Sequence, residues 1–168
     1  MATANDLLLD GLGRVHDTVR GVLSGLTVDE LTARPAPDAN TIAWLVWHLT
    51  RIEDDHIAGV AGSEQVWLAD GWAERFGLPF DELATGYGQS SDEVAEVGVD
   101  ADLLAGYQDA VHARAVEYVA GLAEDELARV VDRRWDPPVT LAVRLVSVLN
   151  DATQHAGQAA YVRGLLAR

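Results

Sequence analysis

Asp151 and His155, two residues near the end of the chain, lie four positions apart. In an α-helix, a carboxylate and an imidazole at this spacing project from the same face. A third residue with metal-binding chemistry, His48, lies far upstream in the middle of an apolar segment. If a second helix brings His48 against the pair, three nitrogen and oxygen ligands converge inside a helical bundle. Such a trio is typical of an open metal site.

Arg144 and Gln158 fall on the same helical stripe as Asp151 and His155, because they lie seven positions before Asp151 and three after His155. Ionisable groups on an inward stripe cost stability unless they are partnered. Arg144 is therefore a candidate to hold Asp151 in place or to pair with a carboxylate of a bound molecule. A salt bridge at the end of the bundle explains the position of Arg144 equally well. A rotation of this helix by one residue would bring Gln154 or Gln158 into the site instead.

Each candidate ligand also has an explanation without a metal. A lone histidine on an apolar face, such as His48, is more often a hydrogen-bonded core residue, and Asp151 with His155 can be a local helical pair. His56 lies about 80° round the helix from His48 and can face a groove or solvent. The acidic run Glu53, Asp54 and Asp55 is most simply a solvated turn, and we expect His16 and His112 to be ordinary face residues.

The composition narrows the class of protein. The chain has 168 residues, no cysteine and a formal net charge of −15, and all 12 of its basic residues are arginine. Without thiolates, any metal must be bound by His, Asp or Glu. The negative charge argues against nucleic-acid binding, and no apolar run is long enough to cross a bilayer. We expect a cytoplasmic protein with one domain over residues 1–168, from a GC-rich genome.

Apolar periodicity predicts an all-α fold. Apolar residues recur at helical spacing in four long segments: about 5–26, 41–60, 100–122 and 140–166. Asn40 is the expected N-cap of the second helix and Asp100 or its neighbour that of the third, while Thr27 with Glu30 has the pattern of a capping box. A short helix is expected over 124–131, followed by a loop over 133–138. Four long helices without alternating strand segments predict a four-helix bundle.

The connection over residues 61–98 lacks a sustained period, apart from a short helix expected at Trp72–Phe76. Loops of this length in compact domains are usually functional. Its aromatic residues could form an apolar lid over the open end of the bundle: Trp67, Trp72, Phe76 and Tyr87. The same segment could instead form a dimer surface. Trp44 and Trp47, on the second long helix, are expected to anchor the core.

Two segments resemble a known family. NTIAWLVWHLTRIEDDH and RLVSVLNDATQHAGQAAYVRGLL look like the second and fourth helices of the DinB superfamily of four-helix-bundle metalloproteins. In that family one His on the second helix and two ligands four positions apart on the fourth bind a divalent ion, usually zinc or nickel. The resemblance implies His48, Asp151 and His155 as the ligands. An acidic residue at the position of Asp151 is similar to the mycothiol-dependent maleylpyruvate isomerase branch, which carries an additional C-terminal domain.

Single-domain relatives are similar to thiol S-transferases that use mycothiol or bacillithiol. The resemblance therefore implies a metal-dependent transferase, with zinc preferred to nickel, that activates mycothiol for attack on an electrophilic small molecule. A homodimer is also implied, because members of the family commonly pair through bundle faces. Two alternatives stay open: a non-catalytic metal-binding protein of the stress response, and a thiol-dependent isomerase.

Overall fold

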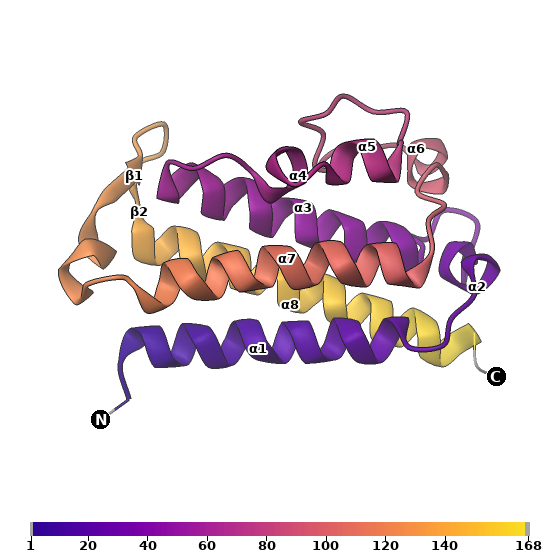
Figure 1. The fold of residues 1–168 in the computed structure, drawn as a ribbon, viewed down its shortest axis with the longest axis horizontal. Helices are drawn as coiled ribbons and strands as arrows, with labels where there is room; N and C mark the ends of the chain where they lie inside the picture. Colours follow the sequence, from indigo (N-terminus) through magenta and orange to yellow (C-terminus); the bar gives the residue numbers. More distant parts are fainter. Residues whose placement is uncertain (1, 167–168) are drawn as a thin grey trace.

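A computed structural model describes residues 2–166 of the chain and contains a bundle of four long helices. They are α1 (Ala4–Leu23), α3 (Ile42–Ala61), α7 (Ala101–Ala120) and α8 (Leu141–Leu166). In Figure 1, α1 and α8 run in one direction, and α3 and α7 in the other. The long connection from α3 returns along the bundle before α7 begins. The predicted four-helix bundle with one long crossover is confirmed.

Short elements join the long helices. They are α2 (Val28–Thr32), α4 (Val66–Ala69), α5 (Trp72–Phe76), α6 (Ser91–Ala95), the 3₁₀ helix η1 (Glu124–Ala128), and the strands β1 (Val130–Asp132) and β2 (Val139–Thr140). The two strands pair antiparallel, with Val130 opposite Thr140 and Asp132 opposite Val139. The sequence did not predict this hairpin, because a strand of two or three residues is too short to show a period. The helix expected over 124–131 is therefore only the 3₁₀ helix η1, which ends at Ala128 because β1 begins at Val130.

The helix ends follow local chemistry. Thr41, rather than Asn40, caps α3, because its hydroxyl accepts a hydrogen bond from the Trp44 amide at 3.1 Å. Asp100 caps α7 as predicted, and Thr27 forms the predicted capping box of α2. α1 ends at Leu23, three residues earlier than expected, where Gly25 takes a left-handed φ of 75°.

The long connection packs into the core instead of forming a removable lid. Trp67, Trp72 and Phe76 are all buried, and their rings pack around that of Tyr107 on α7 at centroid distances of 5.0 to 5.7 Å. Tyr87 is 90% exposed and covers nothing. The prediction of a four-residue aromatic lid was therefore wrong, although another part of this connection does reach the metal-ligand candidates.

The acidic run on α3 is not a solvated turn, because Glu53 and Asp54 are only 1% and 3% exposed. Asp54 accepts hydrogen bonds from the amides of Val66 and Trp67 at 2.9 and 2.8 Å, and from the Tyr107 hydroxyl at 2.8 Å. The connection thus covers the outer face of α3 and is anchored there by a buried carboxyl group. Burial, with the neighbouring Asp54 charge, raises the pKa of Glu53 to about 8.

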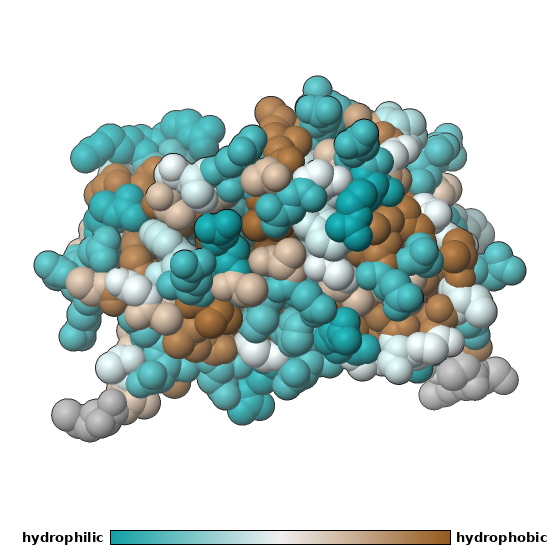
Figure 2. Space-filling model, in the orientation of Figure 1, coloured by the Kyte–Doolittle hydropathy of each residue, from teal (hydrophilic) through white to brown (hydrophobic). Residues whose placement is uncertain are grey.

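The face of the molecule in Figure 2 is mostly hydrophilic, with scattered apolar patches. This agrees with the strongly negative formal charge of the chain. Within residues 2–166, no helix is both long and apolar enough to span a membrane.

Candidate metal centre

The structure brings His48 of α3 together with Asp151 and His155 of α8. Each offers one ligand atom, and these atoms all lie within 4.8 Å of one another. The two imidazole rings meet edge to face at 4.8 Å between centroids, and Nε2 of His155 lies 3.6 Å from Oδ1 of Asp151. The i, i+4 pair and the histidine of the antiparallel helix thus face the same point between α3 and α8.

The long connection fixes the orientation of His48. Its Nδ1 lies 2.6 Å from the carbonyl oxygen of Thr85, so Nδ1 carries the proton and donates it. The other nitrogen, Nε2, is left with a lone pair directed away from the connection. The Trp44 ring stacks on the imidazole at 4.6 Å, and its indole nitrogen donates to Gln89 of the same connection at 2.7 Å. His48 is only 6% exposed, so its orientation is well constrained.

Gly86 makes this close approach of the connection possible. A Cβ at this position would lie 2.8 Å from Nδ1 of His48 and 3.0 Å from the Trp47 ring. Its φ of 91° is also in the region that favours glycine. The Gly-Tyr-Gly sequence at 86–88, which at first indicates only a break, is the signal that the backbone passes close to another group there.

His155 is oriented by its own helix. Its Nδ1 lies 3.0 Å from Oε1 of Gln158, one turn further along, so the amide oxygen accepts the Nδ1 proton and Nε2 keeps its lone pair. Within the described residues, Oδ2 of Asp151 is buried and has no hydrogen-bond partner. The site therefore presents two imidazole lone pairs and a carboxylate oxygen without a donor to satisfy them.

The electrostatics keep His48 neutral. Burial is the largest influence and lowers the pKa of His48; the nearby His155 acts in the same direction, while the Thr85 hydrogen bond and the Asp151 charge oppose it. A histidine must be neutral to bind a metal. Two imidazole Nε2 lone pairs and one carboxylate, with a buried oxygen that has no hydrogen-bond partner among the described residues, fit a divalent cation of the zinc or nickel type.

Comparisons with known proteins show the family of the chain and its fold. The family model described as mycothiol-S-transferase matches residues 7–168. The chain belongs to this DinB-like family. A crystal structure of a conserved protein from Enterococcus faecalis superposes with a TM-score of 0.92 at 35% sequence identity, covering 99% of this chain and 98% of that one. No curated protein matches the chain significantly.

Other residues singled out in this mycothiol-S-transferase family member lie outside the ligand cluster. Arg144 makes its ion pair with Asp132 at 3.3 Å and lies 3.2 Å from Nε2 of His56, with no bond to Asp151 among the described residues. Arg144 therefore does not hold Asp151 but forms the salt bridge at the bundle end, and its pairing with a carboxylate of a bound molecule stays a prediction. Gln154 bonds only to the Asn150 carbonyl of its own helix.

Sequence reasoning missed Thr85, Gly86 and Gln89, which position His48 and Trp44 from the connection. We expected His16 and His112 to be ordinary face residues, and in the structure their rings stack at 4.5 Å between α1 and α7. These two histidines belong to a separate contact, in which His16 lies 2.9 Å from Asp109. They serve below as controls for the metal ligands.

Proposed function

We propose that this protein is a metal-dependent S-transferase that activates a low-molecular-weight thiol, mycothiol, for attack on an electrophilic small molecule. The observation that carries the proposal is the convergence of the three ligand atoms within 4.8 Å. The family description supports the choice of thiol. Zinc is preferred to nickel, because three N and O protein ligands with a position left open are the usual set of a catalytic zinc site.

The protein's own groups prepare the site. Thr85 accepts a hydrogen bond from Nδ1 of His48, and Gln158 accepts one from Nδ1 of His155. Both histidines therefore present Nε2 to a metal without first having to change tautomer. Trp44 stacks on His48 and excludes water from that side. Asp151 supplies a negative charge, which makes the site less electrophilic than a site of three histidines.

A divalent ion held there would stabilise the anionic form of a thiol at neutral pH. In the transfer, sulfur forms a bond to the electrophilic carbon, and the bond from that carbon to its leaving group breaks with the electron pair going to the leaving group. The thiol proton is released to solvent. Asp151 and the two histidines stay in place, so their role is to bind and orient.

The test is consumption of an electrophile, 1-chloro-2,4-dinitrobenzene, with mycothiol and zinc-loaded protein. We expect turnover that falls by about a hundredfold or more in His155→Ala, while the control His16→Gln keeps the wild-type rate. Equal rates in wild type and His155→Ala would contradict the proposal. Bound zinc without any thiol turnover would instead favour the non-catalytic metal-binding alternative.

A further inference from the structure

A second site with unused charge lies further along the same pair of helices. A cavity of about 530 Å³ opens where the C-terminal part of α3 meets β1 and the first turns of α8. Four of the chain's 12 basic residues line it: Arg129, Arg133, Arg134 and Arg144. Two carboxylates, Asp55 and Asp132, also line it. In a chain of net charge −15, this wall therefore carries an excess of positive charge. We call it the arginine pocket.

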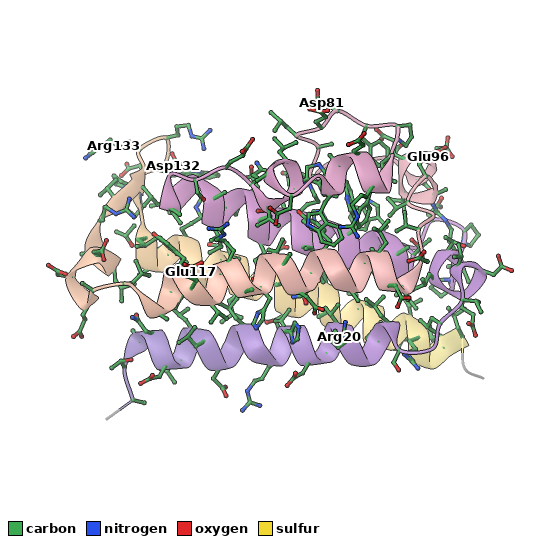
Figure 3. All side chains as sticks on the ribbon, in the orientation of Figure 1. Arg20, Asp81, Glu96, Glu117, Asp132 and Arg133 are labelled. Atoms are coloured by element: carbon green, nitrogen blue, oxygen red, sulfur yellow. The ribbon has the colours of Figure 1, made fainter. Side chains whose placement is uncertain are left out.

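The structure itself places one carboxylate among these arginines. Asp132 is held by the hairpin and its side chain is 6% exposed. It accepts bonds from Nε and Nη2 of Arg134 at 3.0 and 2.8 Å, and one from Arg144 at 3.3 Å. Figure 3 shows Asp132 and Arg133 at the hairpin end of the bundle. Asp132 thus contacts two guanidinium groups, that of Arg134 through the paired bonds that planar two-oxygen anions favour and that of Arg144 through one bond.

Arg144 has a second partner besides Asp132. Its side chain is 19% exposed, and its Nη1 lies 3.2 Å from Nε2 of His56. Because a guanidinium can only donate, His56 accepts there and uses its Nδ1 proton for Asp55, at 3.1 Å. The His56 ring therefore links Arg144 to Asp55.

Arg129 and Arg133 have no anionic partner among the described residues. Arg129 donates to the Val60 carbonyl and the Tyr118 hydroxyl, both at 3.2 Å. Arg133 forms no ion pair with any described residue, although it lines the cavity. Guanidinium groups that outnumber the carboxylates of a concave wall raise the local concentration of small anions.

The arginine pocket and the metal ligands occupy the same stripes of the two helices. Arg144 precedes Asp151 by seven residues on α8, and Asp55 follows His48 by seven on α3. Seven residues are nearly two full turns, and at about 1.5 Å per residue they span about 10 Å. A small molecule with a carboxylate at one end and a reactive carbon at the other could therefore extend between the two sites.

We propose that the arginine pocket binds the carboxylate of an anionic electrophile, whose reactive carbon faces the thiol at the metal centre. The role of the electrophile rests on the proposed S-transferase function. Binding of the carboxylate does not, so the two are tested separately. The substrate class of this site is accordingly carboxylate-bearing electrophiles, rather than neutral ones.

The first experiment measures binding alone, without thiol or turnover. The chain has 5 histidines, so the imidazole NMR signal of His56, assigned by its loss in His56→Asn, reports on the pocket. At constant pH and ionic strength, succinate should shift this signal saturably, while neutral succinamide and chloride should not. Arg144→Gln should weaken succinate binding about tenfold or more, and Arg133→Gln, which removes no ion pair, should weaken it less. Arg114→Gln, an exposed arginine of α7, is the matched control.

Equal shifts with chloride and succinate, or equal shifts of all histidine signals, would overturn the proposal. Tighter binding of inorganic phosphate than of succinate would also overturn it, since the pocket would then be a phosphate site. Arg133→Gln keeps the test valid if Arg144→Gln does not fold.

The second experiment connects the pocket to turnover. N-(4-Chloro-3-nitrobenzoyl)-4-aminobutanoate, whose extended chain is long enough for the spacing of the two sites, and its neutral terminal amide differ only in the charged group. With mycothiol, Arg144→Gln should raise KM for the carboxylate about tenfold, leave kcat within about threefold, and change both constants for the amide far less. Equal effects on the two electrophiles would overturn the pocket's role in the reaction. If neither electrophile is turned over while succinate still binds, the S-transferase function fails and the carboxylate site stands.

Discussion

Two clusters of polar side chains include residues of helix α3, and they differ in whether the protein satisfies their carboxylate oxygens and other acceptor atoms. Asp54, with Tyr107, Arg51 and the amides at the start of α4, forms a network in which the carboxylate accepts three hydrogen bonds and has a guanidinium 3.7 Å away. At the metal centre, by contrast, the protein supplies only acceptors: two imidazole lone pairs and the unpartnered Oδ2 of Asp151. A satisfied network stabilises the fold, whereas unsatisfied acceptors that converge are the mark of a site for a cation.

The largest effect should come from the satisfied network. Asp54→Asn replaces one acceptor oxygen by an NH2 group, which would face the N–H donor of Val66 or Trp67. It also removes the negative charge beside Arg51. Breaking a buried ion pair costs about 3–5 kcal/mol, so we expect a loss of this size in chemical denaturation. At temperatures where the variant is folded, its zinc affinity should equal that of the wild type. A large drop in zinc affinity would show that the two clusters are not separate.

Glu53 is a third kind of buried carboxyl group, with one oxygen, Oε1, unpartnered among the described residues and no basic group beside it. Its folded-state pKa of about 8 lies above the ordinary glutamate pKa of 4.5. Between these pH values the folded state holds a proton that the unfolded state has lost, so stability falls as pH rises, by up to about 1.4 kcal/mol per pH unit. Glu53→Gln should therefore stabilise the protein at pH 8 and have little effect near pH 4. Unfolding curves at several pH values check this, and a constant difference between wild type and variant would contradict it.

Gly86→Ala should damage the metal centre through the connection. The added Cβ would lie 2.8 Å from Nδ1 of His48, with φ at 91°, so the backbone and the histidine must shift. Gly88→Ala is the matched control, because its φ is 76° but its Cβ would contact nothing within 4 Å. Both should lose about 1–3 kcal/mol of stability from backbone strain. Only Gly86→Ala should also lose about 10–100-fold in zinc affinity, measured with a competing chelator; equal affinities of the two variants would contradict the account.

Gln158→Ala should have the smallest effect. It removes the acceptor that orients His155, and loss of such a partner typically costs about 10–100-fold in metal affinity. Because Gln158 is exposed, stability without metal should not change. Gln154→Ala is the control on the same helix, since that side chain bonds only to its own backbone. If both variants bind zinc equally well, Gln158 does not orient the ligand.

The sequence predicted the long helices and the pairing of Asp151 with His155 because both rest on local periodicity, whereas His48 was joined to that pair by the family resemblance. The start of α3 shows the limit of such local signals. Either Asn40 or Thr41 could cap this helix, and only the path of the chain decides that Thr41 does. The burial of Glu53 and Asp54 was unpredictable, since it depends on the connection folding back over α3. The same holds for Thr85, whose carbonyl reaches His48 from 37 residues away in sequence. A two-strand hairpin that holds Asp132 against Arg144 leaves no periodic signal at all.

The central claim is that His48, Asp151 and His155 form a metal site, and metal content tests it most directly. Elemental analysis of protein purified without a polyhistidine tag should find about one zinc or nickel per chain. His48→Ala and His155→Ala should lose it, while the control His16→Gln retains it. Less than about a tenth of an equivalent in the wild type, unrecovered after adding zinc, would contradict the claim and leave these histidines as core residues.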